Sequence, residues 1–267
     1  MRSLRLGRRH AVRWLLGGAP VLGGLLAPLD LRAWSSPRPA TAVRALFIGN
    51  SYTRFNDLPG TVQSLAASVH GGPPLSAHAI ANPGWDLPRH WRSERTRGAL
   101  EAGGFTHVVL QGHSLTALEH PHEFAGYAGF FHDIIRRHGA LTVLFETWAR
   151  RRDSRLYARG ALAVSPHHMQ SLITDCYAAL ARDLQAELAP AGRAFLLAEQ
   201  AGDLGANLYR SDGAHPSREG TLLAALVLCA ILTRVDPRRT TFVPEGVAPA
   251  TAARLRQIAR ASLDPAG

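Results

Sequence analysis

Three residue types that together perform nucleophilic acyl transfer occur near the two ends of the chain. Ser51 follows an apolar run in Gly49-Asn50-Ser51-Tyr52, and Asp212 stands three residues before His215 in the segment LYRSDGAHPS. A serine nucleophile needs a base within hydrogen-bond reach and an anion that holds the imidazole in the right tautomer. Ser51, His215 and Asp212 supply that set. The alternative is that Ser51 and Asp212 stabilise turns and that His215 is a buried structural histidine.

Acyl transfer also needs hydrogen-bond donors aimed at the developing oxyanion, and two further segments offer them. Gly84, in Asn82-Pro83-Gly84-Trp85, has an N–H that no side chain obstructs. Gln111, in Gln111-Gly112-His113-Ser114, has an amide that donates at any pH. His113 is the alternative donor in that segment, although it must hold the right tautomer or charge. The sequence therefore contains every residue type that an acyl-transfer site requires.

A scaffold must bring these segments together, and the pattern from residue 43 onward predicts one. Short apolar runs alternate with longer segments of helical periodicity, which is typical of a parallel sheet covered by helices on both faces. We predict a three-layer α/β/α sandwich with a five-stranded, mainly parallel sheet. Ligands bind at the carboxyl ends of such strands, where the polar segments lie. The predicted strands are 43–48, 75–80, 107–110, 141–145 and 194–197, and the predicted helices are 58–69, 87–100, 123–138, 166–188, 221–233 and 249–261.

The composition is that of one globular domain. The chain has 267 residues, of which 46% are hydrophobic and 19% charged, so disordered, collagen-like and small disulfide-rich classes are excluded. The two cysteines, Cys176 and Cys229, rule out a Cys-rich zinc site, and they leave open one disulfide or two buried thiols. Lysine is absent, which excludes Schiff-base chemistry.

The first 42 residues have the composition of an export signal. A basic segment precedes the weakly apolar run WLLGGAPVLGGLLAPL, which contains glycines and prolines and is too interrupted for a stable membrane anchor. The pair Arg8-Arg9 resembles a twin-arginine signal, and an ordinary secretory signal is the alternative. Ala40-Thr41-Ala42 fits a cleavage site and Leu31-Arg32-Ala33 is the less suitable alternative, so we expect a periplasmic or secreted domain at residues 43–267. Much of the net charge of +10 lies in this leader, and we expect no nucleic-acid partner.

On these blocks the chain is identified as a member of the SGNH, or GDSL-type, hydrolase superfamily. It resembles an exported bacterial branch in which Gly-Asn-Ser replaces Gly-Asp-Ser-Leu, over about residues 43–234. The resemblance implies a flavodoxin-like fold, with Ser51 as nucleophile and first oxyanion donor and Gly84 as second donor. It also implies that Asp212 orients His215, the general base. The superfamily's Gly-x-Asn-Asp block is replaced by VVLQGHS, so Gln111, or His113, is expected to supply the third donor.

Three residues near these blocks are candidates for substrate binding. Trp148 and Arg150 follow the fourth predicted strand, and Trp85 follows Gly84. An aromatic surface suits stacking on a sugar ring, and an arginine could bind an acidic saccharide or close over the substrate. Core packing is the alternative for both tryptophans.

These observations predict an exported serine esterase that needs neither metal nor cofactor. A helix start explains the run His120-Pro121-His122-Glu123 about as well as a metal site does, and nothing else in the sequence has the spacing of a closed or catalytic metal site. The expected substrate is a small acyl ester, above all an O-acetyl group on a glycan, and this expectation rests on the resemblance to carbohydrate esterases. The alternatives are a glycan O-acyltransferase with the same triad and an inactive carbohydrate-binding relative. The oligomeric state is left open.

Overall fold

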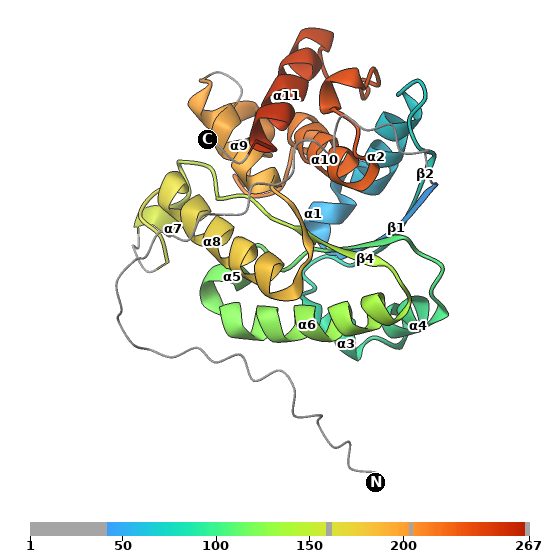
Figure 1. Cartoon of the computed structure of the whole chain (residues 1–267). Coiled ribbons are helices and arrows are strands. Elements are labelled where there is room, and N and C mark those ends of the chain that lie inside the picture. Colours follow the sequence, from blue (N-terminus) through green and yellow to red (C-terminus); the bar gives the residue numbers. More distant parts are fainter. Residues whose placement is uncertain (1–41, 159–161, 203–204, 265–267) are drawn as a thin grey trace.

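The computed structural model describes residues 42–158, 162–202 and 205–264 as a parallel sheet between two layers of helices (Figure 1). The predicted leader lies almost entirely outside the described residues. The sheet has five strands in the order β2-β1-β3-β4-β5, and every neighbouring pair is parallel. The prediction of an α/β/α sandwich with a five-stranded sheet is confirmed. The strands are β1 (Val43–Gly49), β2 (Leu75–Ala81), β3 (His107–Leu110), β4 (Leu141–Phe145) and β5 (Glu187–Ala189).

Alternate residues of each central strand face opposite helical layers. In β1, Ala45 and Phe47 belong to one buried cluster, and Leu46 and Ile48 belong to the other. This is the two-residue period of a strand that is covered on both faces. The first cluster is completed by α2 (Leu58–Ala67), α9 (Ala191–Gln200), α10 (Arg218–Thr233) and α11 (Pro249–Ser262). The second is completed by α3 (Leu87–Arg92), α4 (Glu94–Ala102), α5 (Thr116–Glu119), α6 (Pro121–Arg137) and α8 (Pro166–Leu184).

The predicted position of the fifth strand was wrong. Residues 194–197 lie inside α9, and the strand is the segment Glu187–Ala189, which overlaps the end of the helix predicted at 166–188. In α9 the buried positions Ala191, Ala194, Phe195 and Ala198 follow helical spacing and face the sheet. A strand of three residues at the sheet edge is too short to show a period of two, so the more apolar run beside it was mistaken for the strand.

The single helix predicted at 87–100 is two helices. The Asp86 side chain accepts a hydrogen bond from Arg89 N–H and caps α3, and the chain leaves helical geometry at Ser93, which caps α4. Ser93 therefore both ends one helix and begins the next.

Helix α10 crosses the middle of its layer and is buried along its length from Gly220 to Thr233. Of the helices in the described part of the chain, none combines the length and apolarity needed to cross a membrane. Cys229 on α10 and Cys176 on α8 are both free thiols, so the disulfide alternative is not realised.

Candidate active site

The structure brings Ser51, His215 and Asp212 together at the carboxyl end of the sheet. Ser51 Oγ lies 2.9 Å from His215 Nε2, and His215 Nδ1 lies 2.6 Å from Asp212 Oδ2. The second carboxylate oxygen of Asp212 accepts hydrogen bonds from the N–H groups of Ala214 (2.9 Å) and His215 (3.0 Å). Partial burial opposes ionisation of Asp212, but these hydrogen bonds outweigh it and lower its pKa to about 2. Asp212 is therefore an anion that holds the His215 imidazole by Nδ1, while Nε2 of the same ring contacts Ser51.

Ser51 begins a short helix, α1 (Ser51–Arg54), immediately after β1. Asn50 shapes this junction: its Oδ1 accepts from Tyr52 N–H (3.1 Å), and its Nδ2 donates to the carbonyl oxygen of Trp85 (3.0 Å). His90 holds the preceding residue, because its Nε2 lies 2.8 Å from the carbonyl oxygen of Gly49. The sequence reasoning did not assign roles to Asn50 and His90. In the sequence, only its position next to Ser51 could have indicated the role of Asn50. Nothing could have indicated that of His90, which lies about forty residues from Gly49.

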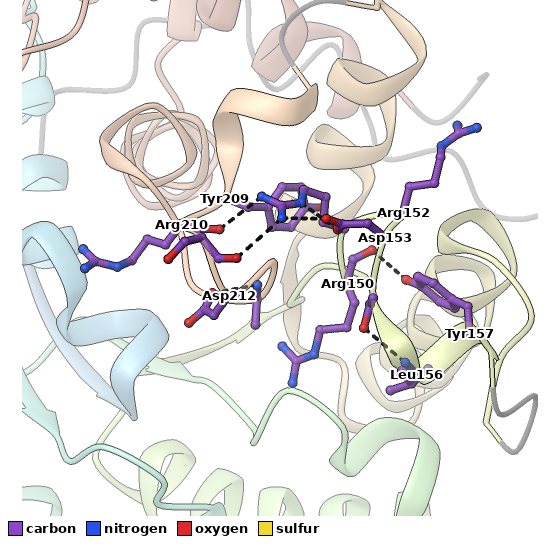
Figure 2. Close-up of polar contacts among 12 residues, drawn as sticks. Arg150, Arg152, Asp153, Leu156, Tyr157, Tyr209, Arg210 and Asp212 are labelled. Atoms are coloured by element: carbon purple, nitrogen blue, oxygen red, sulfur yellow. Dashed lines mark hydrogen bonds and ion pairs between the residues drawn. The ribbon is translucent and has the colours of Figure 1, made fainter.

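The loop that carries Asp212 and His215 is fastened on both sides. Tyr209 pairs with Pro216 in an antiparallel bridge, and Arg210 N–H donates to the His215 carbonyl at 2.9 Å. Figure 2 shows this loop beside the segment that follows β4. There Arg151 N–H donates to the Gly213 carbonyl (2.9 Å), and its guanidinium contacts the carbonyl oxygens of Arg210 and Ser211. The same guanidinium donates two hydrogen bonds to the Asp153 carboxylate, at 2.7 and 2.8 Å, which fix its position.

The role predicted for Gln111 is not supported. Gln111 is fully buried, and its amide nitrogen donates to Asn50 Oδ1 (2.9 Å) and to the Gly112 carbonyl (2.5 Å). Its amide oxygen accepts from Asn50 N–H (3.0 Å) and Thr53 Oγ1 (2.9 Å). Both amide hydrogens are thus committed, so none remains for an oxyanion. Gln111 instead holds Asn50 and Thr53, the residues on either side of Ser51 and Tyr52, in place.

The remaining candidates for the oxyanion hole border the pocket. Within the described residues, the N–H groups of Ser51 and Gly84 donate to no other group, and Gly84 adopts a left-handed conformation with φ of 71°. His113, the alternative to Gln111, also borders the pocket. Burial lowers the pKa of His113, and the nearby charge of Arg150 lowers it further. His113 is accordingly held neutral near pH 7, and a neutral imidazole has one N–H to donate.

Trp148 lies beneath the site and does not line it. Its side chain is fully buried between Tyr52 and Phe195, with parallel rings at centroid distances of 4.7 and 4.1 Å. Its indole N–H donates to the Ala214 carbonyl at 3.0 Å, beside His215. The alternative of core packing is therefore correct for Trp148. Trp85 is half-buried and packs edge-on against His90 at 5.0 Å, outside the pocket lining.

Ser51 and His215 open on a pocket of about 700 Å³. Arg150, the third predicted substrate-binding residue, lines this pocket and donates to Ser114 Oγ (2.8 Å) and to the Tyr52 hydroxyl. In the described part of the chain, no group of three or more His, Cys, Asp or Glu side chains comes together as a metal site. The other lining residues are Asn50, Tyr52, Arg54, Phe55, Asn56, Pro83, Gly84, His113, Ser114 and Ala214.

The comparisons with known proteins agree with this geometry. No protein-family model and no curated protein matches the chain. A structure from Slackia heliotrinireducens, described as a candidate SGNH hydrolase, is 28% identical with a TM-score of 0.62, and the match covers 72% of this chain and 99% of that one. A DUF4886 family protein from Bacteroides uniformis is 18% identical with a TM-score of 0.65, covering 82% of this chain and 94% of its own.

A third similar structure is a variant of Axe2, described as an acetyl-xylooligosaccharide esterase from Geobacillus Stearmophilus. It is 12% identical with a TM-score of 0.55, and the match covers 74% of this chain and 95% of that one. At such identity the likeness concerns the fold. The parallel sandwich, the serine after β1 and the Asp-His loop before α10 have the arrangement of an ester-hydrolysing serine hydrolase. The chain belongs to the SGNH hydrolase superfamily.

Proposed function

We propose that this chain is an exported serine esterase that hydrolyses small acyl esters, namely O-acetyl groups carried by a saccharide. The observation that carries the proposal is the hydrogen-bonded series from Ser51 through His215 to Asp212, which opens on a pocket large enough for a saccharide unit. An adjacent general base of this kind turns a weakly nucleophilic serine hydroxyl into a competent nucleophile.

In the proposed mechanism, Ser51 Oγ attacks the ester carbonyl while its proton passes to His215 Nε2. Asp212 stabilises the imidazolium that forms, because it remains ionised and lies 2.6 Å from Nδ1. The oxyanion is held by the N–H groups of Ser51 and Gly84, with His113 in place of the unsuitable Gln111 as the third donor. His215 then protonates the leaving alcohol. Water, deprotonated by His215, hydrolyses the acyl-enzyme.

Two features support the finer parts of the proposal. The leader at residues 1–42 has the composition of an export signal, so the ester is expected outside the cytoplasm. Axe2, a structure of similar fold, is described as acting on acetylated xylooligosaccharides, which makes an acetylated glycan a reasonable first substrate. The choice of substrate is thus an argument by analogy.

The test is hydrolysis of p-nitrophenyl esters from acetate to octanoate by wild-type protein and by Ser51→Ala. We expect turnover that is highest on acetate and falls by at least about 10³-fold in the variant, since loss of the nucleophile removes the covalent route. Ser171→Ala is a matched control, because Ser171 is an exposed serine on α8 whose hydroxyl bonds only its own helix. Circular dichroism checks that each variant is folded.

Absence of turnover by folded wild-type protein would contradict the esterase proposal. Acetyl transfer from the same esters to an added oligosaccharide would then identify an acyltransferase. Glycan binding that survives in Ser51→Ala, without turnover or transfer, would identify a binding protein.

A further inference from the structure

The pocket beside Ser51 is lined by cationic groups without a balancing carboxylate. Arg54 and Arg150 are among the described residues that line it, and none of those residues is Asp or Glu. Arg210 adds a third guanidinium near the rim, 4.9 Å above the ring of Phe55, which is a lining residue. Within the described residues, the Arg54 guanidinium makes no hydrogen bond or ion pair, whereas the backbone N–H of Arg54 donates to the Asn50 carbonyl. Such a pocket attracts anions.

Arg150 is the cation most closely built into the pocket. Its guanidinium is partly buried and donates to two neutral oxygens, the Ser114 hydroxyl at 2.8 Å and the Tyr52 hydroxyl. Burial raises the pKa of Tyr52, so this phenol does not ionise to neutralise Arg150. A guanidinium has five N–H donors, and these two contacts leave others free. A partly buried charge without a counter-ion is costly, which makes the site incomplete without an anion.

Two carboxylates on the loops around the pocket are committed elsewhere. Asp212 bonds His215 and the backbone of its own loop, while Asp153 bonds Arg151. In Figure 2 the Arg150 side chain points away from Asp153. The backbone of Arg150 is fixed at the same time, because its carbonyl accepts from the Tyr157 hydroxyl at 2.6 Å. A rigid backbone thus presents a cation to the pocket.

We propose that Arg150 binds a carboxylate of the substrate, so that the esters hydrolysed here are acidic, as in an acetylated saccharide that contains uronic acid. The guanidinium fork matches the two oxygens of a carboxylate, and Ser114 and Tyr52 hold the fork in place. The inference rests on the proposed esterase function, and it specifies the class of substrate for that site.

Wild-type protein tests the inference with two pairs of esters. One pair is 4-acetoxybenzoate and its methyl ester, which place or remove a carboxylate on the alcohol side. The other is 4-nitrophenyl hydrogen succinate and its methyl ester, which do so on the acyl side. We expect kcat/KM to be at least about tenfold higher for the anionic member of one pair, because a charge-assisted hydrogen bond is gained. The pair that responds identifies the side on which the carboxylate lies.

Variants then locate the preference. Arg150→Gln should remove the ratio of anionic to neutral kcat/KM, and Arg150→Lys should retain part of it, since an ammonium keeps the charge without the fork. Arg152→Gln is the matched control: its side chain is 83% exposed and pairs with Glu199, so the ratio should stay at the wild-type value. An equal loss on anionic and neutral esters in Arg150→Gln would overturn the proposal and give Arg150 a role in the oxyanion hole.

A binding measurement separates this inference from the esterase proposal. Calorimetry with 4-acetamidobenzoate and its methyl ester uses an amide in place of the scissile ester and therefore needs no turnover. Tighter binding of the anionic amide, lost in Arg150→Gln, would support the carboxylate site even if no ester were hydrolysed. Ser51-dependent hydrolysis with no preference for either anionic ester would leave the esterase standing and overturn the carboxylate site.

Discussion

Glu146 is a fully buried carboxyl whose ionisation should make the stability of this protein depend on pH. It follows β4 directly, and its Oε1 accepts from Gln170 (2.6 Å) and Thr174 (2.9 Å). Its Oε2 has no partner among the described residues. Burial raises the pKa of Glu146 from 4.5 to about 7, although the hydrogen bonds oppose that rise.

The sign follows from the two pKa values. The folded protein holds the Glu146 proton more tightly than the unfolded chain, so folding takes up a proton between about pH 4.5 and 7. The resulting stabilisation is complete below pH 4.5 and is lost as pH rises through 7. This difference between the folded and unfolded pKa of Glu146 lowers the free energy of unfolding by about 2 to 3 kcal/mol between pH 5 and pH 8.

The perturbation is Glu146→Gln, which keeps the shape of the side chain and removes its titration. Urea unfolding at fixed ionic strength, from pH 5 to 8, gives the free energy of unfolding of both proteins. We expect the loss of stability over that range to be smaller in the variant by about 2 to 3 kcal/mol, whatever the amide itself costs. Glu94→Gln, at an exposed carboxylate on α4, should follow the wild-type curve. Parallel curves for wild type and Glu146→Gln would refute the reasoning.

Two further changes test the catalytic geometry. Asp212→Asn keeps an oxygen for the Ala214 and His215 N–H groups but cannot hold the productive imidazole tautomer, so kcat on p-nitrophenyl acetate should fall about 10⁴-fold with little change in KM. Gly84→Ala forces a side chain into a backbone with φ of 71° and should lower kcat/KM about tenfold by moving an oxyanion donor. Gly71→Ala is the control, because Gly71 also has a left-handed backbone, with φ of 69°, but lies outside the pocket lining. This variant should lose about 1 kcal/mol in the free energy of unfolding by urea and keep the wild-type kcat/KM. Equal losses of kcat/KM in the two glycine variants would count against Gly84 as an oxyanion donor.

The sheet was predictable wherever strand and helix periods were long enough to differ. The first four strands were predicted within a residue or so of their observed ends, because each is an apolar run between segments of helical periodicity. The fifth was not, because an edge strand of three residues carries too little pattern, and the more apolar α9 stands next to it.

The site was predictable in its spacing but not in the direction of its side chains. Asp212 and His215 are three residues apart on one turn, so their contact follows from local geometry. The orientation of Gln111 depends on Asn50 and Thr53, which lie about sixty residues away, and no local pattern records it. The buried position of the Trp148 ring likewise depends on distant residues, because Tyr52 and Phe195, from two other elements, stack on its two faces.

The separation of Ser51 and His215 by 164 residues also governs when the protein becomes able to react. At ordinary rates of synthesis, the histidine leaves the ribosome roughly ten to thirty seconds after the serine. The nascent chain therefore carries a serine that lacks its base for most of its synthesis. Closing so long a loop is costly in chain entropy, and that cost is met only when α10 packs against the earlier elements. A nascent fragment that ends before the loop of Asp212 and His215 therefore has no general base for Ser51. Acyl transfer by the proposed mechanism begins only after that loop has been synthesised and has folded against α1.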